Sequence, residues 1–191
     1  MFMLLQICWE KRKLGMHPNQ RIFNSLDGTD FRCNEHESFP KNKRWYSHKF
    51  NGPALRYEVA LSIKNCDIVW EYGGVRAGEY NDLELARLCY IHKVDANEKT
   101  VADSGYKDEL FFVNAPSFSK YDATDPSQYA LKRIMTRHET VNERLKNYAV
   151  LSEIFGRPAH EHPKIFKAYV NLVQLAIENG EPLAKLGIYG Y

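Results

Sequence analysis

Two neighbouring segments of the chain have the pattern of a β-hairpin. Residues 52–63 (GPALRYEVALSI) alternate between apolar and polar side chains, and residues 66–75 (CDIVWEYGGV) form a second run suited to a strand. Only Lys64 and Asn65 separate the two runs, which is the length of link that joins antiparallel strands. Residues 21–33 predict another strand before them. The first part of the chain therefore predicts three strands that can pair antiparallel.

The rest of the chain alternates between helical and strand patterns. Residues 80–94 are predicted to be helical, and 99–106 and 109–116 to contain short strands. A long helix is expected after Asp125, which can act as an N-cap, with Pro126 at its first position. A last helix is expected from His162-Pro163 to Asn179-Gly180. This order predicts a mixed α/β fold in one domain.

Composition narrows the class of protein. The chain has 191 residues, of which 44% are hydrophobic and 26% charged, and this fits one globular domain. Its four cysteines are scattered without a C-x-x-C pair, which disfavours a structural zinc site or a disulfide framework. The apolar run at the N-terminus is too short to cross a membrane and lacks the layout of a signal peptide. Residues 1–20 are interpreted as a truncated leader.

Acidic residues follow or begin several predicted elements. Asp27 and Asp103 each close an apolar run, Asp82 lies where a helix begins, and Glu139 lies within the long helix. The Asp27-Gly28 pair also fits a plain turn, Asp82 a helix N-cap, and Glu139 an exposed helix surface. If such carboxylates meet, they can hold Mg²⁺ or Mn²⁺, because hard cations take oxygen ligands. A pair of these ions is the arrangement used in phosphodiester chemistry.

A basic stretch precedes the hairpin. It contains Trp45 and Tyr46 interleaved with cations, namely Lys41, Lys43, Arg44 and Lys49. Such a stretch can contact phosphates without reading sequence. An exposed, solvated loop is an equally good interpretation.

Taken in order, a series of short motifs resembles the DDE-superfamily transposases, in particular the PIF/Harbinger type and related bacterial elements. The motifs run from about residue 21 to the end of the chain: DGT, WYSHKFNGPALRYEVALSI, IVWEYGG, GEYNDLEL, VADSGY, RHETVNERLKNYAVL and HPKIFKAYVNLVQLAIENGEP. The resemblance implies a ribonuclease-H-like mixed sheet flanked by helices. It also implies that residues 21–191 form an endonuclease catalytic domain.

The resemblance implies specific roles for the acids. Asp27 of DGT is the first catalytic acid, Asp103 of A-D-S-G-Y the second and Glu139 the third, with 35 residues between Asp103 and Glu139. Two Mg²⁺ or Mn²⁺ ions are then held by Asp27, Asp103 and Glu139. Two roles remain for Asp82: it is either a fourth metal ligand or the true second catalytic acid. Some bacterial relatives carry a lysine seven residues after the third catalytic acid, and Lys146 occupies that position after Glu139.

The sequence also departs from the pattern. The His-Asp pair usual after the third strand is Asn81-Asp82 here, and the arginine expected four residues before Glu139 is replaced by Met135. Arg133 and Arg137 lie on other faces of the helix. The segment before Asp27 is too short for the helix-turn-helix module that such transposases carry, so a separate DNA-binding partner protein is an expectation.

Three functions follow as expectations. The first is a transposase core that cleaves and joins DNA at transposon ends, in the nucleus, with DNA as partner, a possible homodimer as its assembly and no membrane association. The second is a catalytically silent, transposon-derived remnant that binds DNA or protein. The third is a structure-specific nuclease that uses the same acids without transposition.

Overall fold

The computed structural model describes residues 7–35 and 42–184. Its centre is a six-stranded mixed sheet, curled into a half-barrel. The strands are β1 (Ile22–Arg32), β2 (Tyr46–Ser47), β3 (Gly52–Ser62), β4 (Ile68–Arg76), β5 (Lys99–Ala102) and β6 (Phe112–Asn114). The mixed α/β class predicted from the sequence is confirmed.

The pairing of the strands places β1 in the middle of the sheet. β3 pairs antiparallel with both β1 and β4, whereas β5 pairs parallel with β1 and β6 parallel with β5. The order across the sheet is therefore β4-β3-β1-β5-β6, and the short β2 pairs with the first residues of β3. The predicted hairpin is confirmed as β3 and β4. Parallel strands need a crossover, and the segment that contains α1 supplies it between β4 and β5.

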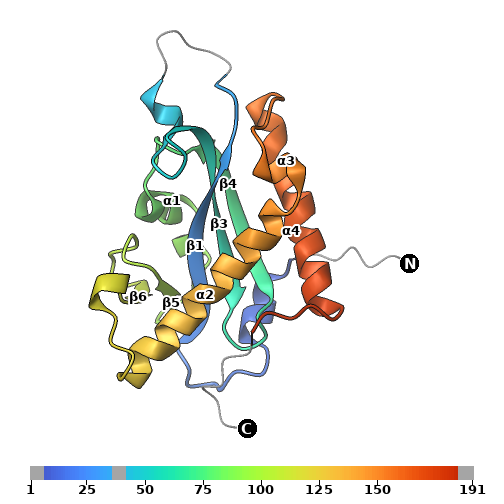
Figure 1. Cartoon of the computed structure of the whole chain (residues 1–191). Helices are drawn as coiled ribbons and strands as arrows, with labels where there is room; N and C mark the ends of the chain where they lie inside the picture. The colour runs from blue at the N-terminus through green and yellow to red at the C-terminus, as the bar shows by residue number, and fades with distance from the viewer. Residues whose placement is uncertain (1–6, 36–41, 185–191) are drawn as a thin grey trace.

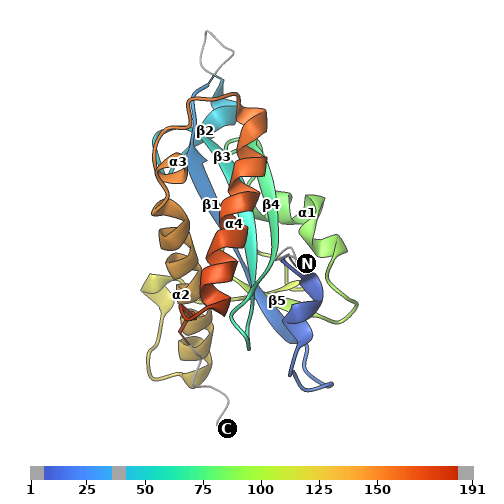
Figure 2. The same cartoon turned by 90° about the vertical axis from the view of Figure 1, so that its right-hand side faces the viewer.

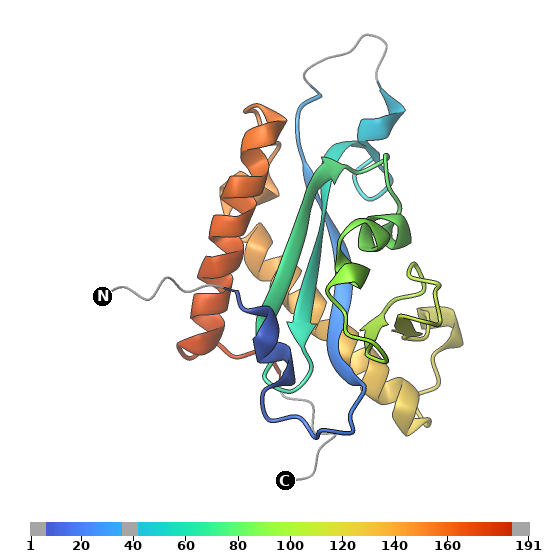
Figure 3. The ribbon, with the colours of Figure 1, turned by 180° about the vertical axis from the view of Figure 1, so that it is seen from behind.

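Helices cover both faces of the sheet (Figure 1). The α-helices are α1 (Asp82–Leu88), α2 (Pro126–Lys146), α3 (Ala149–Ser152) and α4 (His162–Glu178). Short 3₁₀ helices are η1 (Trp9–Lys13), η2 (Lys43–Trp45), η3 (Tyr90–His92), η4 (Phe118–Lys120) and η5 (Ala159–Glu161). Figures 2 and 3 show α4 and α2 against one face and α1 against the other.

The two faces bury separate clusters of apolar side chains. On the α4 face, Phe31 and Tyr57 from the sheet pack with Phe166, and the Tyr57 and Phe166 rings stack with centroids 3.9 Å apart. On the α1 face, Leu26 packs with Tyr90, Tyr106 and their neighbours. Because side chains alternate along a strand, one strand supplies both clusters.

The ends of the long helices agree with the sequence signals. The side chain of Asp125 caps α2 by accepting hydrogen bonds from the backbone N–H groups of Ser127 and Gln128, and Pro126 is the first helical residue. α4 begins at His162-Pro163 and ends beside Asn179, as predicted. Its buried face contains Phe166, Val170, Val173 and Ile177, whereas Leu172 is exposed.

The strand predicted over residues 21–33 is confirmed as β1, Ile22–Arg32. The interpretation that Asp27 closes this strand is wrong, because residues from Gly28 onward pair with β3. The Asp-Gly pair therefore lies in extended backbone, and the turn interpretation is also wrong, because the antiparallel partner strand extends past it. The helix predicted over residues 80–94 is divided at Cys89 into α1 and η3.

Candidate active site

Asp27 lies in the central strand and faces α2. Ser25 and Asp27 lie two residues apart on one face of β1, and both meet α2: His138 Nε2 is 2.9 Å from Ser25 Oγ, and Asn142 Nδ2 donates to Asp27 Oδ2 at 3.5 Å. Leu26 belongs to the cluster on the α1 face. The carboxylate of Asp27 is thus held on rigid scaffold between the sheet and a long helix.

Asp82 and Asp103 approach the same region from two other elements. Asp82 is the first residue of α1, and Asp103 directly follows β5. A Cβ atom placed on Gly105 would lie 2.9 Å from Asp103 Oδ1 and 3.1 Å from Asp82 Oδ2, so both carboxylates surround that point. A Cβ placed on Gly28, the residue after Asp27, would lie 2.8 Å from Asp82 Oδ1. Glycine at both positions leaves room for the acids.

The N-cap interpretation of Asp82 is wrong. The cap is Asn81, which forms a capping box with Glu84: each backbone N–H donates to the side chain of the other residue, at 2.9 Å. A capping box satisfies two N-terminal donors of the helix. The Asp82 carboxylate is therefore available for another role.

Burial and neighbouring charges raise the pKa values of Asp27 and Asp82. The pKa of Asp27 is raised to about 7, chiefly by burial; Lys49 opposes this rise, and Asp103 and Asp82 contribute to it. The pKa of Asp82 is also raised, first by burial, and Arg56 is the main opposing charge. Like charges in a partly dry site disfavour ionisation. The site consequently holds fewer negative charges near neutral pH than its residues suggest.

Arg56 connects Asp82 with a second buried acid. Its Nε donates to Asp30 Oδ1 at 2.9 Å and its Nη1 donates to the Tyr80 carbonyl at 2.8 Å. Nη1 also lies 3.4 Å from Asp82 Oδ1, an ion pair without hydrogen-bond geometry. Among the described residues Asp82 Oδ1 has no hydrogen-bond partner although it is buried. An orphaned carboxylate oxygen of this kind is suited to an additional cation or proton.

The structure does not bring Glu139 into contact with the other acids. Glu139 is exposed on α2, one turn before Asn142, and it is Asn142 that reaches Asp27. Lys146 shares this helix face and lies over the Phe50 ring, with Nζ 5.8 Å from its centroid. Burial and Lys49 lower the pKa of Lys146, whereas Asp30 and Asp27 raise it.

The acids offer the oxygen donors that a hard cation prefers, but their side chains are not arranged closely enough to coordinate one. Across residues 7–35 and 42–184, no three His, Cys, Asp or Glu side chains are grouped so that they could hold a metal ion. The donor set of Asp27, Asp82 and Asp103 consists of oxygens, which Mg²⁺ and Mn²⁺ prefer. Binding there would require Asp82 to leave Arg56 and the side chains to close on the ion.

The basic stretch lies partly at this site. Lys49 donates from Nζ to the Gly28 carbonyl at 3.0 Å, beside Asp27. Lys43 and Arg44 are exposed on η2, while Lys41 lies outside the described residues. Trp45 is buried rather than interleaved with exposed cations, and the Arg76 guanidinium carbon lies 5.1 Å from its ring centroid.

Sequence reasoning missed two residues beneath the site. Glu58 is fully buried in β3, opposite Gly28, and Tyr106 OH donates to its Oε1 at 3.0 Å. The pKa of Glu58 is raised to about 8, chiefly by burial, with a smaller contribution from the charge of Asp82. The available signal was a glutamate directly between Tyr57 and the apolar run Val59-Ala60-Leu61.

In the described part of the chain, no helix is long and apolar enough to cross a membrane. Comparison with protein-family models, with curated proteins and with solved structures finds no match.

Proposed function

We propose that the chain is the catalytic core of a divalent-metal-dependent DNA endonuclease of the DDE type, which cleaves and joins phosphodiester bonds at transposon ends. The observation that carries the proposal is the approach of Asp82 and Asp103 to one point beside Gly105, with Gly28 and Asp27 on the adjoining strand. Asp27 lies on the central strand, and Asp103 and Asp82 are near enough to contribute to its raised pKa. Oxygen donors in one region suit hard cations once their side chains close on the ion.

The order of the strands supports a ribonuclease-H-like core. The central β1 lies between an antiparallel β3 and a parallel β5. This arrangement places the middle of β1 beside the carboxyl end of β5, which is where Asp27 and Asp103 lie. The DDE resemblance predicts those two positions for the first and second acids.

The residues of the chain have distinct roles in this proposal. Asp27 and Asp103 would hold Mg²⁺ or Mn²⁺, with Asp82 and Glu139 as further ligands, and the bound ions would activate the attacking oxygen and stabilise the leaving one. Asp27 must lose its proton first, and Arg56 must release Asp82. Lys49 would contact a phosphate beside Asp27, with Lys146 on α2 as a supporting cation. DNA as partner and the nucleus as location follow from this substrate.

A second candidate, the silent remnant that binds DNA or protein, is favoured by one specific observation. No three potential ligands are grouped for a metal in the described residues, and Glu139 is exposed. A chain that had lost catalysis would retain the sheet and the basic stretch without a working metal site. The two candidates differ in whether the acids bind a metal.

Calorimetric titration of Mn²⁺ tests the proposal. The wild type is compared with Asp27→Asn, Asp82→Asn, Asp103→Asn and Glu139→Gln. Glu143→Gln is the matched control, because Glu143 is an exposed glutamate one turn further along α2. The proposal expects the wild type and the control to bind Mn²⁺, and each aspartate variant to bind it more weakly.

Nicking of supercoiled plasmid in Mn²⁺ is the second readout. A wild type that nicks the plasmid, together with an Asp27→Asn variant that does not, supports the nuclease. A folded wild type that binds DNA, does not bind Mn²⁺ and does not nick the plasmid would overturn the nuclease proposal and favour the silent remnant. If Glu139→Gln behaves like Glu143→Gln, the third acid has been assigned to the wrong residue.

A further inference from the structure

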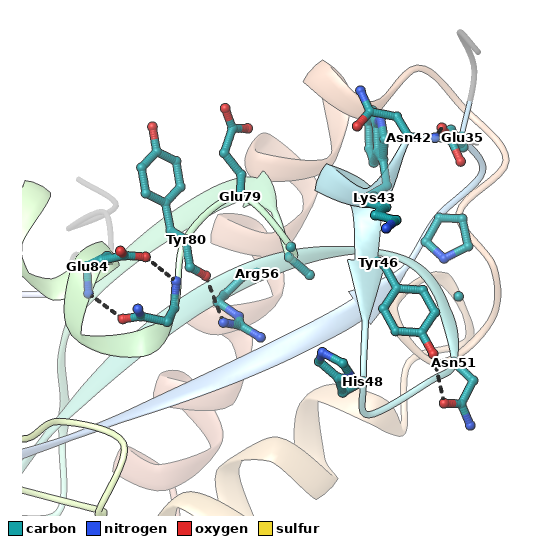
Figure 4. Close-up of a pocket in the computed structure, with 16 residues that line it drawn as sticks. Glu35, Asn42, Lys43, Tyr46, His48, Asn51, Arg56, Glu79, Tyr80 and Glu84 are labelled. Atoms are coloured by element: carbon teal, nitrogen blue, oxygen red, sulfur yellow. Dashed lines mark hydrogen bonds between the residues drawn. The ribbon is translucent and has the colours of Figure 1, made fainter. Parts of the chain in front are cut away.

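A cavity of about 750 Å³ is lined in part by Arg56, which also lies 3.4 Å from Asp82 Oδ1 in the candidate active site. One wall comes from the segment that contains β2 and the start of β3, and the other from residues 77–81 and Glu84. Figure 4 shows Tyr46 and His48 on one side and Tyr80 and Glu84 on the other, with Arg56 between them. This volume lies in the range of pockets that hold complete small ligands. It is called the Tyr46–Tyr80 pocket below.

The two tyrosines present aromatic rings from opposite walls. Tyr46 is 39% exposed, its hydroxyl donates to Asn51 Oδ1 at 3.1 Å, and its ring makes an edge contact with the His48 ring at 5.1 Å. These contacts hold the ring in place without covering it. Tyr80 is half-buried, and its backbone carbonyl is fixed by Arg56. The lining thus includes one tyrosine from each wall.

The charges of the pocket do not suit a phosphate. Lys43 and Arg56 are balanced by acidic side chains in the lining, which are Glu35, Glu79 and Glu84. Arg56 is moreover already paired with Asp30 at 2.9 Å. A neutral, planar ring with polar edges matches the lining better than an anion does, since the amide groups of Asn42 and Asn51 complement the aromatic rings.

Arg56 joins the pocket to the candidate active site. The same guanidinium that lines the pocket lies 3.4 Å from Asp82 Oδ1. A DNA strand with a phosphate at Asp27 and Asp103 would therefore carry its neighbouring nucleotide toward the pocket. Lys49, beside Gly28, lies in the same short segment as Tyr46 and could hold the intervening backbone.

We propose that the Tyr46–Tyr80 pocket binds an unpaired nucleobase of the DNA strand, next to the phosphate that is cleaved. This proposal rests on the function proposed above. Enzymes that act on DNA can take a base out of the helical stack, and aromatic side chains then replace the lost stacking. The pocket favours strands whose bases are exposed over intact duplex.

The test compares single-stranded with duplex DNA. Fluorescence anisotropy measures binding of a labelled oligothymidylate, and of a duplex of equal length, in metal-free buffer so that no cleavage occurs. Tyr46→Ala and Tyr80→Ala should each weaken single-strand binding by about fivefold or more, the effect of losing one stacked base. Duplex binding should be unchanged. Thermal unfolding confirms that each variant is folded.

Two matched controls separate stacking from other effects. Tyr46→Phe keeps the ring and loses only the hydroxyl bond to Asn51, so it should bind the single strand like the wild type. Tyr129→Ala removes a tyrosine that is 46% exposed on α2, outside the pocket lining, and should have no effect. Free deoxyadenosine monophosphate should compete far more weakly than the strand.

The outcomes distinguish this proposal from the nuclease proposal. If the alanine variants bind the single strand like the wild type, or lose both probes equally, the pocket proposal is overturned even when the wild type nicks plasmid. If they lose the single strand selectively, the pocket proposal stands even when no nicking occurs. A wild type that binds neither probe overturns the pocket proposal, and so does equal competition by the free nucleotide, because the DNA strand then plays no part in binding.

Discussion

The hydroxyl of Tyr106 donates a hydrogen bond to Glu58 Oε1 at 3.0 Å, beneath the candidate site. The second oxygen, Oε2, is buried without a hydrogen-bond partner among the described residues. A buried carboxylate in this state is costly when ionised, which explains why its pKa is raised to about 8. The folded protein therefore keeps a proton on Glu58 that the unfolded chain releases near pH 4.5.

This pair predicts how stability depends on pH. Between pH 4.5 and about 8 the folded state binds more protons than the unfolded state at Glu58, so its contribution to stability is lost as pH rises. Glu58→Gln should flatten this fall in denaturant unfolding measured across that range. If the free energy of unfolding rises toward pH 8 in both the wild type and Glu58→Gln, the raised pKa of Glu58 is contradicted.

Mn²⁺ affinity should increase with pH through about 7. Asp27 must be ionised to ligate a metal, and its pKa is raised to about 7, chiefly by burial. Below that value protons compete with the metal, so titrations should show affinity rising by up to about tenfold per pH unit. Asp27→Asn should remove the dependence together with most of the affinity. A pH-independent affinity in the wild type would exclude Asp27 as a ligand.

Gly28→Ala should weaken metal binding while the fold is retained. The added Cβ would lie 2.8 Å from Asp82 Oδ1, so the Asp82 side chain must move. Mn²⁺ calorimetry and circular dichroism measure the two effects separately. Gly156→Ala is the control, because a Cβ there would meet its nearest neighbour at an ordinary 3.8 Å. Equal affinities for the two variants would mean that Asp82 takes no part in binding.

Lys49→Ala should reduce DNA affinity and its salt dependence. Lys49 lies beside Gly28 and Asp27, where a phosphate is expected, and each neutralised phosphate adds about one to the slope of log affinity against log salt. Filter binding over a range of salt concentrations measures this slope. Lys93→Ala, another exposed lysine, should leave it unchanged. The same slope in both variants would remove Lys49 from the interface.

The buried ion pair between Arg12 and Glu98 should be essential for stability. Arg12 is 1% exposed, and its Nε and Nη2 donate to the two Glu98 oxygens at 3.0 and 3.1 Å. Arg12→Met removes the guanidinium from Glu98, which keeps contacts with Asn24 at 3.3 Å and Lys13 at 3.7 Å, and this should cost about 3 kcal/mol in urea unfolding. The double variant Arg12→Met/Glu98→Gln should recover part of this loss. Additive effects in the double variant would show that the two side chains do not interact.

The sequence predicted local features well and distant contacts poorly. The β3–β4 hairpin, the Asp125 cap and the start of α4 at His162 depend on neighbouring residues and were correct. Asp27 was interpreted as a strand end because the residues that pair with β1 beyond it, Ala54 to Glu58 on β3, are distant in sequence. The roles of Asn142 and Glu58 could not be predicted, because they depend on how α2 and β3 lie against β1.

The position of β1 in the sheet has a consequence for folding kinetics. β3 and β4 are close in sequence and can pair early, but β1 must also pair with β5, whose partner residues are far along the chain, such as Ser25 with Val101. Closing such a long loop is entropically costly and slows folding relative to local pairing. Asp27 and Asp103 come together only in that late step. During synthesis the carboxylate cluster therefore forms only after β5 has left the ribosome.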